Sequence, residues 1–598
     1  MQTQPVLAPK AQITILDTGG QYCHLIARKV RDLGVYADVR PSETPAAELV
    51  GVRGLIISGG PHSVYDSDSP GIDVAILQNG HPTLGICYGQ HLMAHLLGGS
   101  VRQGSKGEFG FAHLDFTTAR PHSKLLAGLT DHQRIWMSHR DTVTAVPPGF
   151  SVLATTETCA VAAIEDEARH LYGVQFHPEV VHTLEGQRLL ENFVFGICGC
   201  TKDWNPKSRI PAVEQQIRDT VGDRSVFFFV SGGVDSTVAF TLCLRALGKD
   251  RVRGVYVDTG LMREGETEFV REMFRTLGAD TVAVESAAEQ FLTPLAHVTD
   301  PEHKRAIIGE EFVRVQERIV ESRHLLDGHW ILGQGTIYPD TIESGGTVKA
   351  AVIKTHHNRV AGIQKLLESG RIVEPLSSFY KDEVREIGRE LSIPREFLDR
   401  HPFPGPGLAI RCLCAEANAP LEPVADGFIA PIRSVGVQGD SRSYAPILVL
   451  SEFPSESGKL QGRATELVNA SRDFNRVVAL VATHQPLSAT SVQSSRLTQE
   501  RLDRLRQADA TVRRMSAQHG FERQIWQFPV VLIPLGTAAT PDSIVLRPVD
   551  SVDGMTAESV TMPDVLLRAM ADVLLSIPGI CSVLYDLTHK PPATIEWE

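Results

Sequence analysis

Short apolar runs alternate with longer mixed stretches along the first third of the chain. Four runs have the length and composition of buried strands: residues 13–16, 54–57, 83–86 and 171–174. Two further stretches have the apolar spacing of helices: residues 22–33 and 90–97. Because strands that alternate with helices form βαβ units, the pattern predicts a doubly wound, mostly parallel sheet over residues 11–200.

The alternation returns after a polar, proline-containing break at residues 201–206, which we interpret as a linker. Apolar runs at 226–230, 252–257 and 330–332 predict a second doubly wound, parallel-sheet domain over residues 201–407. Its last residues, His401-Pro-Phe-Pro-Gly-Pro-Gly407, must form a rigid loop, because prolines at this density fit neither a helix nor a central strand. Residues 343–359 are rich in Gly, Lys and His, and we interpret them as a flap.

The last third, residues 408–598, contains a weak internal repeat. A strand, a helix and a strand are expected at residues 431–437, 464–475 and 477–481, and again at 544–549, 563–575 and 582–585. This pattern predicts an α+β C-terminal domain with two related subdomains.

Composition narrows the class of protein. The 598 residues are 42 % hydrophobic and 22 % charged, which is ordinary for a globular enzyme of several domains. The net charge of −13 argues against an extensive nucleic-acid groove, and no apolar run approaches the ~18 residues of a membrane helix. Nine cysteines without metal-site spacing fit a reducing cytoplasm. We therefore expect a cytoplasmic enzyme of small molecules, without a nucleic-acid or membrane partner.

The most informative segment follows the apolar run at 226–230. Its glycines allow a tight turn that brings backbone N–H groups close to an anion, and the helix after it presents the positive end of its dipole. No Walker lysine is present. The pocket is expected to consist of Ser231, Gly232, Gly233, Val234, Asp235, Ser236 and Thr237. The segment resembles the pyrophosphate loop of the N-type ATP pyrophosphatases. That resemblance implies that ATP is the substrate and that the acceptor is adenylylated with release of pyrophosphate.

A second site is expected where the run at 83–86 ends. In Gly85-Ile-Cys-Tyr-Gly89 the glycines permit a strained strand-to-helix turn that projects Cys87, and the helix N-terminus favours its thiolate. His177 and Glu179 of Gln175-Phe-His-Pro-Glu179 supply a base and a group to orient it. Backbone N–H groups of an oxyanion hole are expected from Gly59, Gly60 and Tyr88.

Gly-Gly-Pro at 59–61, Gly-X-Cys-X-Gly at 85–89 and His-Pro-Glu at 177–179, within one α/β domain, jointly resemble the class I glutamine amidotransferase domain over residues 11–200. The resemblance implies hydrolysis of glutamine through a thioester, with release of ammonia. Members of the family usually have Gln four residues after the nucleophile, whereas this chain has His91 there. We expect His91 to contact the glutamine substrate. Because free ammonia is mostly ammonium at neutral pH, a glutaminase joined to an adenylylating domain predicts transfer of nitrogen onto an activated oxygen.

Motifs of the second and third segments indicate the acceptor. Residues 257–263, 333–343, 354–358, 380–384 and 401–407, with the C-terminal string 586–598, closely resemble the glutamine-hydrolysing GMP synthase family over nearly the whole chain. The resemblance implies that xanthosine 5′-monophosphate (XMP), ATP, glutamine and water give GMP, AMP, pyrophosphate and glutamate, with Mg²⁺ on the nucleotide. By the same resemblance the second domain is adenine-nucleotide α-hydrolase-like, and His356 and His357 lie in a flap over the adenylylation site. The residues implied to contact XMP are Arg263, Asp440, Gln527, Lys590 and Glu596.

Two alternatives stay open at this point. One is an ATP pyrophosphatase with another acceptor, such as a carboxylate in NAD or asparagine synthesis, which the 401–407 loop and the C-terminal string disfavour. The other is a non-catalytic nucleotide-binding regulator with a decayed glutaminase, which the intact Cys87, His177 and Glu179 disfavour. The C-terminal domain resembles the longer form of the family, with additional residues around 448–528. Because this addition can occupy the place of a second subunit, both a monomer and a homodimer are expected.

Overall fold

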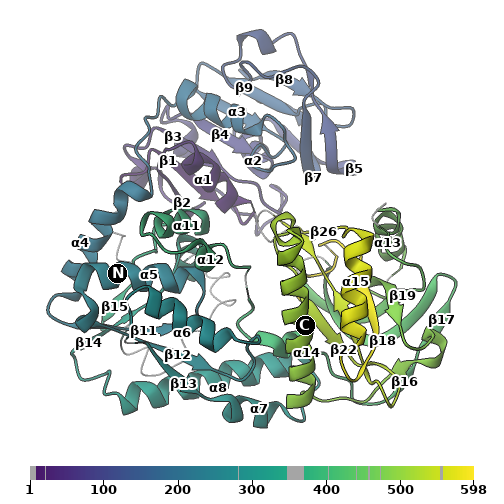
Figure 1. The fold of residues 1–598 in the computed structure, drawn as a ribbon. Coiled ribbons are helices and arrows are strands. Elements are labelled where there is room, and N and C mark those ends of the chain that lie inside the picture. The colour runs from purple at the N-terminus through teal and green to yellow at the C-terminus, as the bar shows by residue number, and fades with distance from the viewer. Residues whose placement is uncertain are drawn as a thin grey trace. The chain divides into compact units, whose positions relative to one another are not determined.

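The structure is a computed structural model (Figure 1) that describes residues 9–598 except 21, 281, 346–365, 367–368, 402, 439–440, 456–457, 472, 552–556 and 591. The chain forms two compact units. The first contains the residues up to Asp219 and two later segments that begin at Gly335 and Glu374. The second contains the remaining residues. His356, His357 and most of the predicted flap lie outside the described residues, as does Asp440.

The first unit is built on an eight-stranded sheet. Its neighbouring strands are, in order, β2 (Ala37–Pro41), β1 (Ile13–Asp17), β3 (Gly54–Ile57), β4 (Thr83–Ile86), β10 (Leu171–Val174), β9 (Ala163–Asp166), β8 (Ser151–Thr155) and β6 (Asp115–Phe116). The first five are parallel to one another, and the last three add antiparallel pairs. A separate ribbon joins β5 (Ser100–His113) and β7 (Arg134–Ala145). The predicted doubly wound sheet is therefore confirmed.

Both faces of this sheet are covered, which explains why its strands read as unbroken apolar runs. Ile13 and Ile15 pack in one core with α1 (Cys23–Asp32) and α3 (Gly186–Glu191). Leu55 and Ile57 point to the other face and pack with α2 (Tyr88–Leu96). The helix predicted at 90–97 begins two residues earlier than expected, because β4 ends at Ile86 and Cys87 already caps the helix.

Segments from beyond residue 334 complete the first unit around Arg31. This buried arginine donates to the carbonyl of Ser378 at 2.8 Å, and its guanidinium lies against four aromatic rings, those of Tyr36, Trp204, Tyr338 and Tyr380. Trp204 also donates to Glu383. The segment that we interpreted as a linker is thus partly buried, because its tryptophan is needed in this cluster. The helices here are α4 (Ile210–Val221), which ends in the second unit, α9 (Tyr338–Gly345) and α11 (Lys381–Glu390).

The second unit begins with a five-stranded sheet in which all neighbours are parallel. The strand order is β13 (Val282–Ser286), β12 (Val252–Asp258), β11 (Ser225–Val230), β14 (Trp330–Gly333) and β15 (Ile372–Val373). The helices of this part are α5 (Val234–Leu247), α6 (Glu266–Thr276), α7 (Ala288–Leu295), α8 (Pro301–Ser322) and α12 (Arg395–Leu398). The chain runs from β11 outward to β12 and β13 on one side and then crosses back to β14 on the other side of β11. The end of β11 is therefore the switch point at which such sheets bind ligands.

The remaining residues form a seven-stranded mixed sheet. Its order is β17 (Glu422–Val424), β18 (Gly427–Gln438), β19 (Ser441–Leu450), β20 (Arg476–Thr483), β27 (Ile580–Asp586), β24 (Asp542–Leu546) and β22 (Val530–Ile533). The two predicted strand–helix–strand halves meet at the antiparallel pair β20–β27 and share this single sheet. The helices are α13 (Lys459–Ala470), α14 (Gln499–Gln518) and α15 (Asp564–Leu575). The helix expected at 464–475 ends earlier, because the chain must turn before β20 begins at Arg476.

Short pairings complete the second unit: β16 (Ala419–Pro420), β21 (Ser491–Val492) and β23 (Leu535–Gly536) form one small sheet, and β25 (Val549–Asp550) pairs with β26 (Glu558–Ser559). Among the described residues, no helix is both long and apolar enough to cross a membrane.

The C-terminal string is part of the buried core. Asp586 is fully buried and accepts hydrogen bonds from Arg476 and Trp597, each at 2.9 Å. Glu598 accepts from the completely buried Lys304 of α8 at 2.7 Å. A buried charge without a partner is strongly destabilising. Asp586 therefore requires Arg476, and Glu598 requires Lys304.

Candidate active sites

The nucleophile candidate lies in a strained turn between β4 and α2. Cys87 has a φ of +52°, which a residue with a side chain rarely adopts, and it caps the helix N-terminus. The flanking glycine Gly89 is required, because a Cβ there would lie 2.3 Å from the carbonyl oxygen of Ile57. The Cys87 thiol faces the carbonyl oxygen of Ser138 at 3.8 Å. This geometry matches the expected nucleophile elbow.

The predicted base follows β10, the strand beside β4. His177 is 4 % exposed, and its Nδ1 lies 2.7 Å from Oε1 of the fully buried Glu179. Burial alone would lower the pKa of His177, but the Glu179 carboxylate and a hydrogen bond with Cys87 together raise it to about 10. His177 thus lies beside Cys87 as a proton donor.

Gly59 and Gly60 lie at the end of β3, next to the same pair. A Cβ on Gly59 would be 3.0 Å from the ring of His177 and 3.5 Å from Cβ of Cys87. Thr18 donates to the carbonyl oxygen of Gly59 at 2.8 Å. Because the C=O and N–H of a trans peptide point in opposite directions, this bond turns the N–H of Gly60 away from Thr18. Tyr88 opens α2, where backbone N–H groups have no partner within the helix.

The side chain of His91 is hydrogen-bonded to a neighbouring glutamine, Gln175. Its Nε2 lies 2.6 Å from Oε1 of Gln175, and the amide of Gln175 reaches the sulfur of Cys87 at 3.7 Å. Burial lowers the pKa of His91 to about 4, although the bond to Gln175 opposes this shift, so the ring is neutral and donates. Sequence reasoning missed Gln175 and Ser138 as neighbours of the nucleophile. Gln175 belongs to the same short motif as His177, and this proximity in the sequence was the only sign that it could lie near Cys87.

The phosphate loop occupies the switch point after β11. Gly232 has a φ of +72°, and α5 begins at Val234, so Asp235, Ser236 and Thr237 lie in its first turn. Ser231 accepts from the N–H of Gly233 at 3.2 Å and lies 3.1 Å from the hydroxyl of Ser236. Arg400 donates to the carbonyl of Gly232 at 3.2 Å. Arg400 thus holds the loop by a hydrogen bond from a distant part of the chain. The hydroxyl and N–H groups of the loop lie at a helix N-terminus.

Basic side chains gather near this loop, between β12, α14 and the 401–407 loop. Arg263 and Arg411 both lie on the ring of Phe403, at 4.4 and 5.5 Å from its centre. Arg411 binds Glu596 through two hydrogen bonds of 2.9 and 2.6 Å. Arg411 thus connects Glu596 to the Phe403 ring, on which Arg263 also lies.

Charge within this cluster is incompletely balanced. Burial lowers the pKa of Arg263 to about 10; Asp509 opposes the shift, whereas Arg411 and Arg513 strengthen it. The Nε of Arg263 lies 3.6 Å from Oδ2 of Asp509 and, among the described residues, has no hydrogen-bond partner. Nη1 of Arg411 is likewise buried without a partner in the described part of the chain. Oδ1 of Asp509 is also buried without a hydrogen-bond partner among the described residues, so the cluster offers both donors and an acceptor to a ligand. Sequence reasoning missed Arg411, Asp509 and Arg513.

Backbone pairs place two other expected XMP residues, Gln527 and Lys590, next to the β25 and β26 strands. Gln527 pairs with Val549, and Lys590 pairs with Ala557 beyond the β25–β26 hairpin. The Oε1 of Gln527 is buried and has no hydrogen-bond partner among the described residues. Its neighbour Trp526 accepts a hydrogen bond from His401. This hydrogen bond places Gln527 close to the 401–407 loop.

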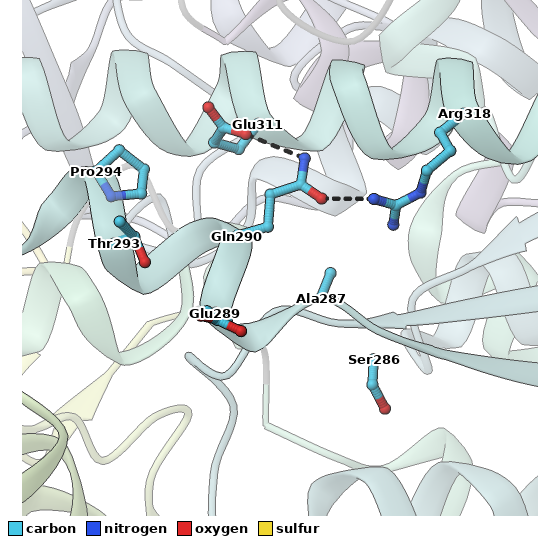
Figure 2. Close-up of a pocket in the computed structure, with 8 residues that line it drawn as sticks. All are labelled: Ser286, Ala287, Glu289, Gln290, Thr293, Pro294, Glu311 and Arg318. Carbon is cyan, nitrogen blue, oxygen red and sulfur yellow. Dashed lines mark hydrogen bonds between the residues drawn. The ribbon is translucent and has the colours of Figure 1, made fainter.

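A hollow of about 590 Å³ lies at the end of β13, between α7 and α8. Figure 2 shows the residues that line it. Its polar side chains bind one another: Gln290 donates to Glu311 at 3.1 Å and accepts from Arg318 at 2.8 Å. The hollow lies two strands away from β11, whose end carries the phosphate loop. Gln290, Glu311 and Arg318 are thus already paired with one another, and the hollow is separate from the phosphate loop.

Comparison with known proteins agrees with this geometry. Residues 14–197 match the family model for "Glutamine amidotransferase class-I", and residues 514–597 match "GMP synthase C terminal domain". Residues 208–306 match the model "NAD synthase". This last match covers the phosphate loop and the strands around it.

Relatives that align over nearly the whole chain identify its family. A protein of Leptospira interrogans described as "Probable GMP synthase [glutamine-hydrolyzing]" is 41 % identical over 98 % of this chain and 99 % of its own. Proteins described as "GMP synthase [glutamine-hydrolyzing]" from Caldicellulosiruptor saccharolyticus and Geobacillus kaustophilus are 40 % and 39 % identical, with the same coverage. The chain belongs to the glutamine-hydrolysing GMP synthase family.

Proposed function

We propose that this chain makes GMP from XMP, with ATP as the activating nucleotide and glutamine as the nitrogen donor. The observation that carries the proposal is the presence, in one chain, of the Cys87–His177–Glu179 arrangement and a lysine-free phosphate loop at a switch point. The first arrangement releases ammonia, and the second activates an oxygen that ammonia can replace. Membership of the family supports both halves.

In the glutaminase half, the Cys87 thiolate attacks the carboxamide carbon of glutamine. The N–H groups of Gly60 and Tyr88 stabilise the oxyanion that forms. His177 gives its proton to the departing ammonia, while Glu179 holds the ring and the charge that develops on it. Water then hydrolyses the thioester to glutamate. Gly59 keeps space beside His177, and His91 acts through its bond to Gln175.

In the synthetase half, the loop binds the outer phosphates of ATP, which leaves the α-phosphorus open to the C2 oxygen of XMP. Pyrophosphate leaves, and ammonia displaces AMP from C2 to give GMP. The binding groups are the hydroxyl and N–H groups of residues 231–237. Asp235, in the first turn of α5, fits a Mg²⁺ that is held mainly by phosphates. That ion would neutralise charge on the leaving pyrophosphate.

XMP is proposed to bind beside Phe403, where Arg263 lies on the ring and Arg411 holds Glu596. Arg263 supplies charge for the 5′-phosphate, and Glu596, Gln527 and Lys590 supply further donors and acceptors. Asp440, outside the described residues, completes the set. The unpaired N–H of Arg263 supports this assignment.

We further propose a glutaminase domain at residues 11–200, a synthetase domain at 201–407 and a C-terminal domain at 408–598. The substrates are small molecules, without a nucleic-acid partner. A cytoplasmic location is supported by nine free thiols, since all nine cysteines lie in the described residues. Either a monomer or a homodimer is consistent with the enlarged C-terminal domain.

The test is an assay of the purified chain with XMP, ATP and Mg²⁺, and with either glutamine or ammonium. We expect GMP, AMP and pyrophosphate with both donors. Release of ADP and orthophosphate would contradict the proposed cleavage at the α-phosphorus. Because residues 208–306 match an NAD synthase model, deamido-NAD is the control acceptor. Its amidation in place of XMP would exclude the proposed substrate.

Arg263→Gln is expected to raise the KM for XMP about 10- to 100-fold, because it removes a charged donor from the phosphate site. The KM for ATP should change little. Steady-state kinetics with ammonium as donor measure both constants without the glutaminase. Arg275→Gln is the matched control, since Arg275 lies on the exposed surface and pairs only locally with Glu272. An equal rise for ATP and XMP would place Arg263 outside a site specific to XMP.

A further inference from the structure

Three side chains with metal-binding atoms meet beside the β5–β7 ribbon of the first unit. Glu108 comes from β5, His139 from β7, and Cys159 from the loop after β8. One donor atom of each, a carboxylate oxygen, a ring nitrogen and a sulfur, lies within 4.8 Å of the other two. His139 and Cys159 are buried, and Glu108 is half-buried. None of the three has a part in the proposed chemistry.

A hydrogen bond indicates which nitrogen of the neutral His139 ring carries the hydrogen. Its Nδ1 lies 2.8 Å from the carbonyl oxygen of Asp141, which can only accept, so Nδ1 carries the hydrogen. In the neutral ring Nε2 then presents a lone pair, and it faces a carboxylate oxygen of Glu108 at 3.1 Å. Two acceptors at this separation require either an additional proton or a cation. A histidine that donates its other N–H to a carbonyl is the usual arrangement of a metal ligand.

The donor set selects the kind of cation. Nitrogen, sulfur and carboxylate oxygen together suit Zn²⁺, whereas Mg²⁺ prefers oxygen alone. The second oxygen of Glu108 accepts from Thr156 at 3.0 Å, and Cys159 lies 3.6 Å from the hydroxyl of Thr142. These bonds orient two of the ligands. Three protein ligands leave one tetrahedral position open, and the Cys159 thiol would release its proton on binding.

The cluster is next to the nucleophile. Ser138, whose carbonyl faces the Cys87 thiol at 3.8 Å, directly precedes His139. A divalent cation on His139 would therefore hold the backbone that borders the nucleophile and would attract the thiolate. Both effects oppose attack on glutamine.

We propose that Glu108, His139 and Cys159 form a Zn²⁺ site whose occupation stops glutamine hydrolysis. The binding itself is independent of the proposed synthesis of GMP. Only the activity measurement depends on the proposed glutaminase at Cys87. Ammonia-dependent synthesis uses the second unit and provides an internal control.

Direct binding is tested by titrating Zn²⁺ into the chelator-treated full chain in competition with a chromophoric indicator. Cys87→Ala serves as the background, so that the nucleophile cannot act as a ligand. Adding Cys159→Ala or Glu108→Gln is expected to weaken binding by at least about tenfold. Cys200→Ala is the matched control, because Cys200 is another buried thiol of the same unit. Unchanged affinity in both cluster variants would overturn the site.

Inhibition is tested on the chain with Cys87 intact. Zn²⁺ is expected to inhibit glutamine-dependent activity of the wild type and of Cys200→Ala, and to spare activity with ammonium. Cys159→Ala should keep its zinc-free glutaminase and lose this sensitivity. A rise in unfolding temperature with Zn²⁺ in the wild type, but not in Cys159→Ala, is expected in parallel. Equal inhibition with both donors, or in all variants, would contradict the proposal. Absence of wild-type glutaminase without zinc would instead refute the proposed function and leave the titration as the test.

Discussion

Cys87→Ala is expected to abolish GMP formation from glutamine and to leave formation from ammonium intact. Alanine removes the sulfur that attacks the carboxamide, and no other thiol occupies the end of β4. A loss of at least about a thousandfold in the glutamine-dependent rate follows from removing a covalent nucleophile. The phosphate loop after β11 belongs to the other compact unit and keeps its structure. The measurement is GMP release under saturating XMP and ATP with each donor.

The two donors serve as controls for each other in this experiment. Cys243→Ala is a matched variant, because Cys243 is a buried thiol of α5 without a proposed role. It should keep both activities. Equal loss with glutamine and ammonium in Cys87→Ala would contradict separate sites for ammonia release and ammonia use.

Glu179→Gln is expected to lower the rate of glutamine hydrolysis about 10²- to 10⁴-fold. The substitution keeps the shape of the side chain but removes the charge that faces Nδ1 of His177 at 2.7 Å. Glu179 is fully buried, so water cannot replace that charge. Glutaminase kinetics measure the loss, and ammonium-dependent synthesis should again be unchanged. Retention of full glutaminase activity would exclude Glu179 as the group that orients His177.

The same variant has a defined effect on stability. The pKa of His177 is raised from 6.5 to about 10 in the folded chain, so its protonation stabilises the fold below pH 6.5. This contribution is lost as the pH rises through about 10. The unfolding temperature of the wild type should therefore exceed that of Glu179→Gln at low pH, and the difference should shrink across this window. Titration of isotopically labelled His177 checks the pKa directly, and an unshifted value in the wild type would contradict this reading.

The strands of both parallel sheets could be predicted because each is buried on two faces. Runs such as 54–57 and 226–230 contain apolar residues at every position, so no knowledge of their neighbours is needed. Cys87 and the phosphate loop could also be predicted, because a tight turn between a strand and a helix is a local structure that its glycines specify. The pair His177 and Glu179 lies within one short motif, and the structure confirms their contact.

Other features depend on residues that are distant in the sequence. His91 gave no sign that it binds Gln175, since their contact exists only because α2 and β10 are neighbours. The cluster of Arg263, Arg411 and Asp509 likewise forms only when a β12 loop, the 401–407 loop and α14 meet.

The amino-acid sequence by itself determined the buried strands, the two glycine turns and the chemical groups that each turn presents, because these depend on interactions between near neighbours. Only the tertiary structure decided which charges are paired, which donors stay unsatisfied and how the two C-terminal halves join in one sheet. The physical reason is that burial and electrostatic balance are set by the groups that folding brings together, and one-dimensional spacing does not specify those groups.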